Sequence, residues 1–181
     1  MKTTKTYFLI LFTVLLFTAN QCQKEDLNGL PPETQKGKNT FGCYVDGELF
    51  VKMRGGPTQD PLKATYYREK NYLFLRCISF DRQYISLHID NPQEKKNNSL
   101  RSGLYMTNYN PENISHFFLC EDCSHVFITK FDTINRIVSG TFEFMGRCAY
   151  VSRDTLTNIY CSEESTVQIT KGRFDVKLNV Y

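Results

Sequence analysis

The sequence contains no stretch of apolar residues long enough to cross a membrane as a helix. Its longest apolar run covers residues 7–17, whereas a spanning helix needs about 20 such residues to cross roughly 30 Å of hydrocarbon. Internal repeats, heptads and low-complexity segments are also missing, so repeat and coiled-coil architectures are excluded.

The chain also carries little excess charge of one sign. Its formal net charge is +3, and residues 1–21 contain Lys2 and Lys5 but no acidic residue. The remaining chain therefore has a net side-chain charge of +1. Such a balance argues against a nucleic-acid partner, which usually requires a strongly basic surface.

Catalytic signatures are missing as well. No serine–histidine–aspartate order, HExxH motif, phosphate-binding glycine loop or carboxylate pair is present. The three histidines, His88, His116 and His125, are scattered along the chain. We therefore expect no cofactor and no metal site, and a non-enzymatic protein is the favoured interpretation. An enzyme whose site is assembled from dispersed strand and loop residues is the alternative.

The N-terminus is typical of a signal peptide. Lys2 and Lys5 precede the apolar run, which is too short for a transmembrane helix. Cys22 follows Phe17 by five residues, the placement required for a lipid-modified cysteine, although Ala19 and Gln21 stand where a Leu-like and a small residue are usual. We interpret residues 1–21 as a signal peptide and Cys22 as the attachment point of acyl chains such as palmitate.

The residues after Cys22 predict a surface location. Residues 22–39 are polar, contain two adjacent prolines and lack apolar periodicity, so they are expected to form a flexible tether. The charged start of this tether is similar to the export signal of surface lipoproteins in the Bacteroidota: Gln23, Lys24, Glu25 and Asp26. A solvated linker that happens to be charged is the other interpretation, and an inward-facing position at the outer membrane is the alternative location. The address predicted from these features is the outer membrane, facing the cell exterior.

From residue 40 onward the dominant hydrophobic period is two, which is typical of half-buried strands. In residues 83–90, Ile85, Leu87 and Ile89 alternate with polar side chains, and residues 173–180 repeat the pattern. Further strands are expected at 41–45, 48–51, 63–68, 72–80, 103–109, 125–132, 137–145 and 166–170.

Turn residues separate several of these runs. Asp46-Gly47 and Lys171-Gly172 are each expected to reverse the chain in a tight hairpin, and residues 133–136 form a third turn. The only helical signal is one short turn at residues 111–117. The prediction is a single all-β domain over residues 40–181, an antiparallel β-sandwich of about ten short strands, with a closed β-barrel as the alternative.

Two segments carry a family resemblance. They are residues 30–50, LPPETQKGKNTFGCYVDGELF, and residues 128–144, ITKFDTINRIVSGTFEF, followed by VQITKGRFDVKL at 167–178. The chain resembles an uncharacterised family of small secreted lipoproteins of the Bacteroidota. The resemblance implies a β-rich envelope protein and supplies no catalytic residue. Relative to that family, residues 147–164 look like an insertion.

Beyond Cys22 there are six cysteines, an even number that allows up to three disulfides in an exported chain. Cys148 and Cys161 are the first expected pair, because a bridge would close the inserted segment. Cys43 and Cys77 lie on apolar strand faces, as buried thiols or as partners of each other. Cys120 and Cys123 form a CxxC with strand-like flanks, which favours a local disulfide or loop thiols over a redox or zinc site.

Two surface features remain. Asp132-Thr133-Ile134 and Asp154-Thr155-Leu156 resemble the O-glycosylation sites of exported Bacteroidota proteins, which makes Thr133 and Thr155 candidates. Tyrosines are abundant in the middle of the chain, and exposed aromatic side chains on a β face can stack on sugars or peptides. Packing in the core and at its rim is the other interpretation of the following tyrosines: Tyr66, Tyr67, Tyr72, Tyr84, Tyr105 and Tyr109. The expected partners are thus the membrane, through the lipid, and a glycan, peptide or protein.

Overall fold

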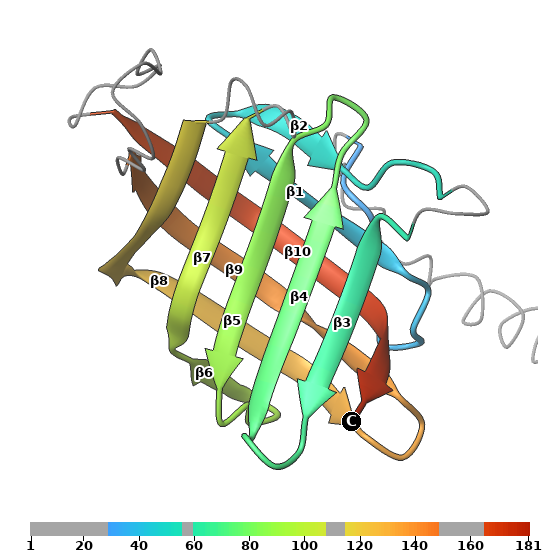
Figure 1. The fold of residues 1–181 in the computed structure, drawn as a ribbon. Helices are drawn as coiled ribbons and strands as arrows, with labels where there is room; N and C mark the ends of the chain where they lie inside the picture. The colour runs from blue at the N-terminus through green and yellow to red at the C-terminus, as the bar shows by residue number, and fades with distance from the viewer. Residues whose placement is uncertain (1–28, 56–59, 108–114, 149–164) are drawn as a thin grey trace, which may run out of the picture.

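The fold is known from a computed structural model that describes residues 29–55, 60–107, 115–148 and 165–181 (Figure 1). All regular structure within these ranges is β, which confirms the predicted fold class. The strands are β1 (Thr40–Val45), β2 (Glu48–Val51), β3 (Leu62–Tyr67), β4 (Tyr72–Ile78), β5 (Tyr84–Asp90), β6 (Lys96–Asn98), β7 (Leu100–Thr107), β8 (Ser115–Asp132), β9 (Ile137–Cys148) and β10 (Thr166–Val180).

The strands form one sheet that curls back on itself. β3, β4, β5, β7, β8, β9 and β10 pair successively as antiparallel neighbours, and the end of β10 then pairs with β3 in parallel, where Leu178 lies opposite Ala64. In Figure 1, β3, β4, β5 and β7 lie in front and cross β9 and β10 behind them. The alternation allowed either a sandwich or a barrel. In the structure the sheet is nearly closed into a barrel.

Apolar side chains from every long described strand point inward and fill the barrel. On β4, Leu73, Leu75 and Cys77 are fully buried, while the alternate side chains face outward. The ring of Phe142 packs against Phe41, with 5.1 Å between the ring centroids. The period-two pattern of the sequence thus places apolar side chains in the interior and the alternate side chains on the outer face.

Turn geometry at Asp46-Gly47 agrees with the predicted hairpin. Asp46 and Gly47 have φ angles of 49° and 86°, and the Asp46 carboxylate accepts a hydrogen bond from the Gln168 backbone N–H at 2.7 Å. The turn between β8 and β9 is also confirmed. There the Asp132 carboxylate accepts backbone hydrogen bonds from Ile134 and Asn135.

The predicted hairpin at Lys171-Gly172 is wrong. Residues 166–180 form the single strand β10, and a register shift against β9 lies between Ile169 and Gly172. Lys171 has a φ of 50°, and a Cβ on Gly172 would lie 2.5 Å from the Phe142 carbonyl oxygen. Lys171 therefore supplies the positive φ of a β-bulge, and Gly172 allows the backbone to approach Phe142 closely. A β-bulge and a tight turn use the same residue types, which is why the pair was predicted to form a turn.

The helical turn expected at residues 111–117 is not supported where the structure describes it. Residues 111–114 lie outside the described ranges, and Ser115, His116 and Phe117 are extended residues of β8. Ladder pairing with β7 sets this conformation, since Phe117 lies opposite Tyr105. Tertiary pairing thus overrides the local cap signal.

The end of the predicted tether packs on the barrel instead of remaining free. Leu30 is buried, and Glu33 lies 3.3 Å from the Arg173 guanidinium. The buried Asp175 carboxylate accepts hydrogen bonds from the Gly37 and Lys38 backbone N–H groups at 2.8 and 3.2 Å. Residues 30–38 of the predicted tether therefore contact the barrel ahead of β1.

Candidate functional site

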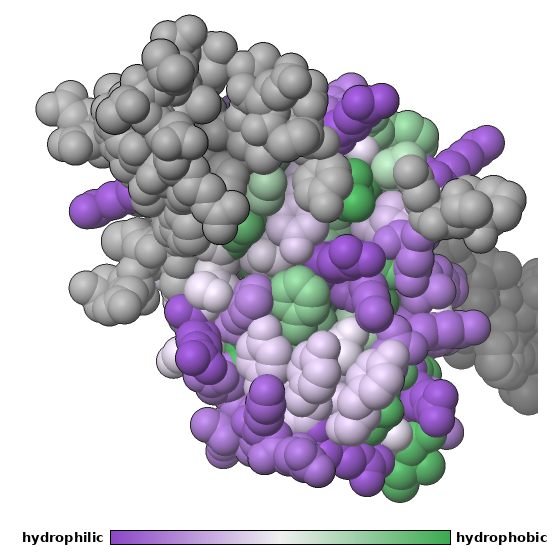
Figure 2. All heavy atoms as spheres, viewed as in Figure 1, coloured by the Kyte–Doolittle hydropathy of each residue, from purple (hydrophilic) through white to green (hydrophobic). Residues whose placement is uncertain are grey.

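Five aromatic rings form a continuous row on the outer face of the barrel, which we call the aromatic row. It consists of Tyr181, Tyr67, Tyr72, His88 and Phe74. Ring centroids are 6.0 Å apart for the first pair and 5.7 Å for the second, both stacked. His88 follows at 5.6 Å from Tyr72 and 4.7 Å from Phe74. Figure 2 shows pale and green side chains gathered over the lower parts of β3, β4 and β5.

Strand register places these rings side by side. Tyr67 and Tyr72 are opposite each other across the β3–β4 hairpin, and Phe74 is opposite His88 across β4 and β5. Tyr181 joins from the end of β10, where its backbone N–H donates to the Tyr66 carbonyl at 3.0 Å and its carbonyl accepts from the Arg68 N–H at 2.9 Å. Directly opposite residues bring their side chains into contact on one face.

The rings remain accessible although they touch one another. Tyr67 is 39% exposed and Tyr181 is 68% exposed. Stacked tyrosines that restrain one another lose little conformational freedom when a ligand binds, because each ring is already held. The row thus offers a rigid, amphipathic surface on the outside of the barrel.

A hydrogen bond fixes the centre of the row. The Tyr72 hydroxyl lies 2.6 Å from Nδ1 of His88. Burial raises the pKa of Tyr72, and burial together with the Arg101 charge lowers the pKa of His88. Burial therefore disfavours the charged form of both groups in this hydrogen-bonded pair.

Two shallow hollows adjoin along this face. The first, the aromatic hollow, has a volume of about 420 Å³ and is lined by Tyr67, Lys70, Tyr72, Phe74 and His88. The second, the amide hollow, has a volume of about 400 Å³ and is lined by residues between Asp90 and Arg101, all of them polar except Leu100. Both volumes lie within the range of small-ligand sites.

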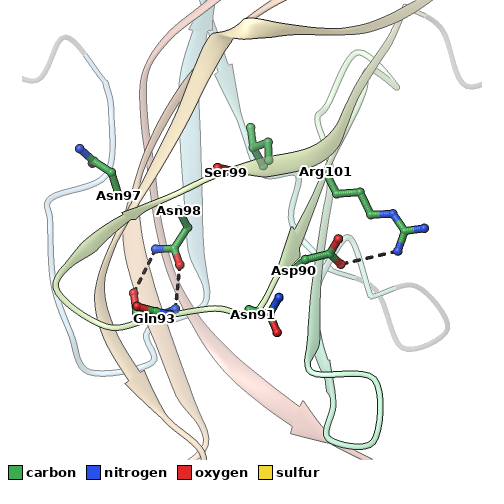
Figure 3. Close-up of a pocket in the computed structure, with 8 residues that line it drawn as sticks. Asp90, Asn91, Gln93, Asn97, Asn98, Ser99 and Arg101 are labelled. Carbon is green, nitrogen blue, oxygen red and sulfur yellow. Dashed lines mark hydrogen bonds and ion pairs between the residues drawn. The ribbon is translucent and has the colours of Figure 1, made fainter.

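The amide hollow is built by the connection between β5 and β7 (Figure 3). Asn98 holds this connection in shape, because its side chain accepts from the Gln93 N–H at 2.7 Å and donates to the Gln93 and Lys96 carbonyls. Asp90 points toward Arg101, with 3.6 Å between their charged atoms. Asn97 lines the same hollow and is exposed.

The two hollows meet at β5. Tyr72, in the aromatic hollow, lies directly opposite Asp90, in the amide hollow. The charges of Arg101 and Asp90 act in opposite directions on the pKa of Tyr72, which reflects the same proximity. Aromatic contacts and polar contacts are therefore available to one ligand.

The structure divides the tyrosines that the sequence singled out. Tyr67 and Tyr72 are in the row, whereas Tyr105 is only 4% exposed and belongs to the core. Tyr66 packs edge-on against Phe131 at the rim of the core, and Tyr84 lies half-buried on β5. Tyr109 falls outside the described residues.

Sequence reasoning missed three members of the row: His88, Phe74 and Tyr181. His88 was interpreted as a chance polar strand residue, yet it bonds to Tyr72 and contacts Phe74. Tyr181 gave no signal, because its neighbours depend on the parallel pairing of β10 with β3. The pairing of Tyr67 with Tyr72 could have been inferred from their positions on either side of the 68–71 turn.

Of the predicted disulfide cysteines, the structure describes the side chains of two. Cys43 and Cys77 are free thiols buried in the core, so the possibility that they bridge each other is not supported. Burial raises the pKa of both thiols. Cys161 and the side chains of Cys120, Cys123 and Cys148 lie outside what the structure describes, so the Cys148–Cys161 bridge stays a prediction.

Six further predicted site residues lie outside the described residues: Cys22, Gln23, Lys24, Glu25, Asp26 and Thr155. Thr133 lies in the turn between β8 and β9, next to the exposed Ile134. His125 is exposed on β8, 3.7 Å from Glu143.

Two further features of the described residues concern metal binding and membrane spanning. Within residues 29–55, 60–107, 115–148 and 165–181, no cluster of three or more His, Cys, Asp or Glu side chains is arranged to hold a metal ion. In the same ranges the structure has no helix with the length and apolar character needed to cross a membrane.

No protein-family model, curated protein or solved structure matches the chain.

Proposed function

We propose that this chain is a non-enzymatic binding module that contacts its ligand through the aromatic row, held at the outer face of the outer membrane by a lipid on Cys22. The single observation that carries the binding role is the stacked contact of Tyr72, Tyr67 and Tyr181 on an exposed face. Large exposed aromatic surfaces in soluble domains commonly mark interaction sites.

The anchoring part of the proposal comes from the N-terminal sequence. The signal-like run, Cys22 and the charged residues after it fit an exported lipoprotein, and the resemblance to small Bacteroidota lipoproteins agrees with that address. A binding module on a tether needs one accessible face. The aromatic row supplies it.

An envelope enzyme is the alternative, and the Tyr72–His88 hydrogen bond is the observation that favours it. Burial disfavours the charged form of both side chains, so the imidazole is available to accept a proton from the hydroxyl. Tyr72→Phe removes the hydroxyl but keeps the ring. Binding that survives Tyr72→Phe supports the module, while turnover of a ligand that stops in Tyr72→Phe supports the enzyme.

The proposal is tested with the mature chain carrying Cys22→Ala, which removes only the lipid attachment point. Binding to an array of plant, microbial and animal glycans and to a peptide library is compared between this protein and Tyr67→Ala/Tyr72→Ala. Phe80→Ala is the matched control, because Phe80 is an exposed aromatic residue, 60% accessible, beyond the other end of β4. A ligand bound by the parent and the control but lost in the double variant supports the proposal. Binding that the double variant retains, or no binding at all, contradicts it.

A further inference from the structure

We infer that the ligand of the aromatic row is a carbohydrate, a disaccharide or longer, whose ring faces pack on the tyrosines while its hydroxyls bind in the amide hollow. This inference rests on the proposed function and names its ligand. The observation behind it is that an aromatic surface and a polar hollow adjoin at Tyr72 and Asp90.

Sugars require both kinds of surface at once. A pyranose ring has an apolar C–H face that packs on aromatic rings, and every hydroxyl at its rim both donates and accepts hydrogen bonds. Side-chain amides offer a donor and an acceptor together, and a carboxylate beside a guanidinium does the same. The combination on this face matches a saccharide chain more closely than an apolar ligand.

Two side chains of the amide hollow, those of Asn97 and Arg101, are available to bind such a ligand. Asn97 is exposed at its edge, and the part of the chain that the structure describes gives its side chain no hydrogen-bond partner. Arg101 contacts Asp90 only at 3.6 Å and is itself exposed. Asn98, by contrast, uses its amide to hold the loop, so it supports the hollow instead of facing the ligand.

Strand pairing argues against an extended peptide as the ligand. β4 lies between β3 and β5, and β5 lies between β4 and β7, so the ladder hydrogen bonds of the strands beneath the row are already made. A peptide could not add to the sheet there as a further strand, which is a common way for β-proteins to bind peptides. Recognition on this face must use side chains.

The amide hollow can be disabled without touching the row. In Asn97→Ala/Arg101→Ala, one exposed amide and one exposed ion pair are lost, and neither carries much folding free energy. Gln168→Ala is the matched control, because Gln168 is an exposed amide near the start of β10. Thermal unfolding of each variant confirms that the fold is kept.

The test uses the glycan and peptide arrays described above. Carbohydrate binding that weakens about tenfold or more in Asn97→Ala/Arg101→Ala, and not in Gln168→Ala, supports the inference. A ligand that depends on the row but is a peptide overturns the inference and leaves the proposed function intact. Glycan binding that is unchanged in Asn97→Ala/Arg101→Ala also overturns the inference. If no probe depends on Tyr67 and Tyr72, the proposed function fails as well.

Discussion

Nδ1 of His88 lies 2.6 Å from the hydroxyl of Tyr72, in the middle of a row of aromatic rings that crosses three neighbouring strands and the end of a fourth. The bond ties β4 to β5 on the outside of the barrel, where side chains usually face water. It holds the row in one arrangement, and the burial of His88 should make the stability of the protein depend on pH.

Stability should fall as the pH drops through about 6.5, the ordinary pKa of histidine. Burial and the charge of Arg101 lower the pKa of His88, so the unfolded chain takes up a proton at a higher pH than the folded protein does. The loss begins near pH 6.5 and is complete below the lowered pKa. Melting temperatures at pH 7.5 and 5.0 should differ more for the parent than for His88→Gln. An equal pH dependence in the two proteins would rule out this role.

A second pH dependence should come from Asp175. Burial raises the pKa of its carboxyl, but hydrogen bonds from Thr34, Ser139 and the backbone of Gly37 and Lys38 outweigh burial and lower the pKa overall. Its contribution is therefore present above about pH 4, the ordinary aspartate value, and is lost as the pH falls further.

Asp175→Ala should destabilise the fold by roughly 3 kcal/mol, because several donors lose their acceptor. Hydrogen exchange of residues 34–38 should accelerate more than that of β4. Serine at position 139 offers a matched comparison, since Ser139→Ala removes one donor and leaves the carboxylate bonded to the backbone. If the two variants have equal stability, Asp175 does not organise the N-terminal segment.

The thiols of Cys43 and Cys77 should be inert in the folded protein. Both are fully buried and both have raised pKa values, so the reactive thiolate is scarce at neutral pH. Iodoacetamide at pH 8 should label them only after unfolding in guanidinium chloride, as read by peptide mass spectrometry. Rapid labelling of the native protein, or recovery of the two as a disulfide, would contradict this burial.

Two variants separate membrane attachment through Cys22 from export to the cell surface through the four residues that follow it. Buried acyl chains contribute roughly 0.8 kcal/mol per CH₂, so Cys22→Ala should release the protein from the membrane fraction. Changing Gln23, Lys24, Glu25 and Asp26 together to Ala should leave it membrane-bound but hidden from protease added to intact cells. A membrane-bound Cys22→Ala protein would refute the lipid anchor, and an accessible quadruple variant would refute the export signal.

Much of the fold was predictable because burial acts on alternate residues. The pattern around Leu87 and the turn at Asp46-Gly47 fixed strand and hairpin positions correctly. Closure of the sheet was not predictable, since a sandwich and a barrel require the same alternation. Lys171-Gly172 was misinterpreted because a bulge and a turn both use a residue with positive φ beside a glycine.

The candidate site was less predictable than the fold. A local turn brings Tyr67 and Tyr72 together, so a hairpin prediction contains that contact. Tyr181 lies beside Tyr67 because β10 pairs in parallel with β3, and these strands are more than 100 residues apart in sequence. The sequence has no local signal for that pairing. The adjacency of Tyr72 and Asp90 likewise requires the register of β4 against β5.

The central claim is that the aromatic row is the binding surface, and tyrosine ring signals test it most directly. The mature chain with Cys22→Ala is labelled with ¹³C-tyrosine, its ring signals are assigned by Tyr→Phe variants, and it is titrated with the glycan that binds best on the array. Signals of Tyr67, Tyr72 and Tyr181 should shift in a saturable way while that of the buried Tyr105 stays unchanged. Shifts confined to tyrosines outside the row, or no shift at saturating glycan, would contradict the account.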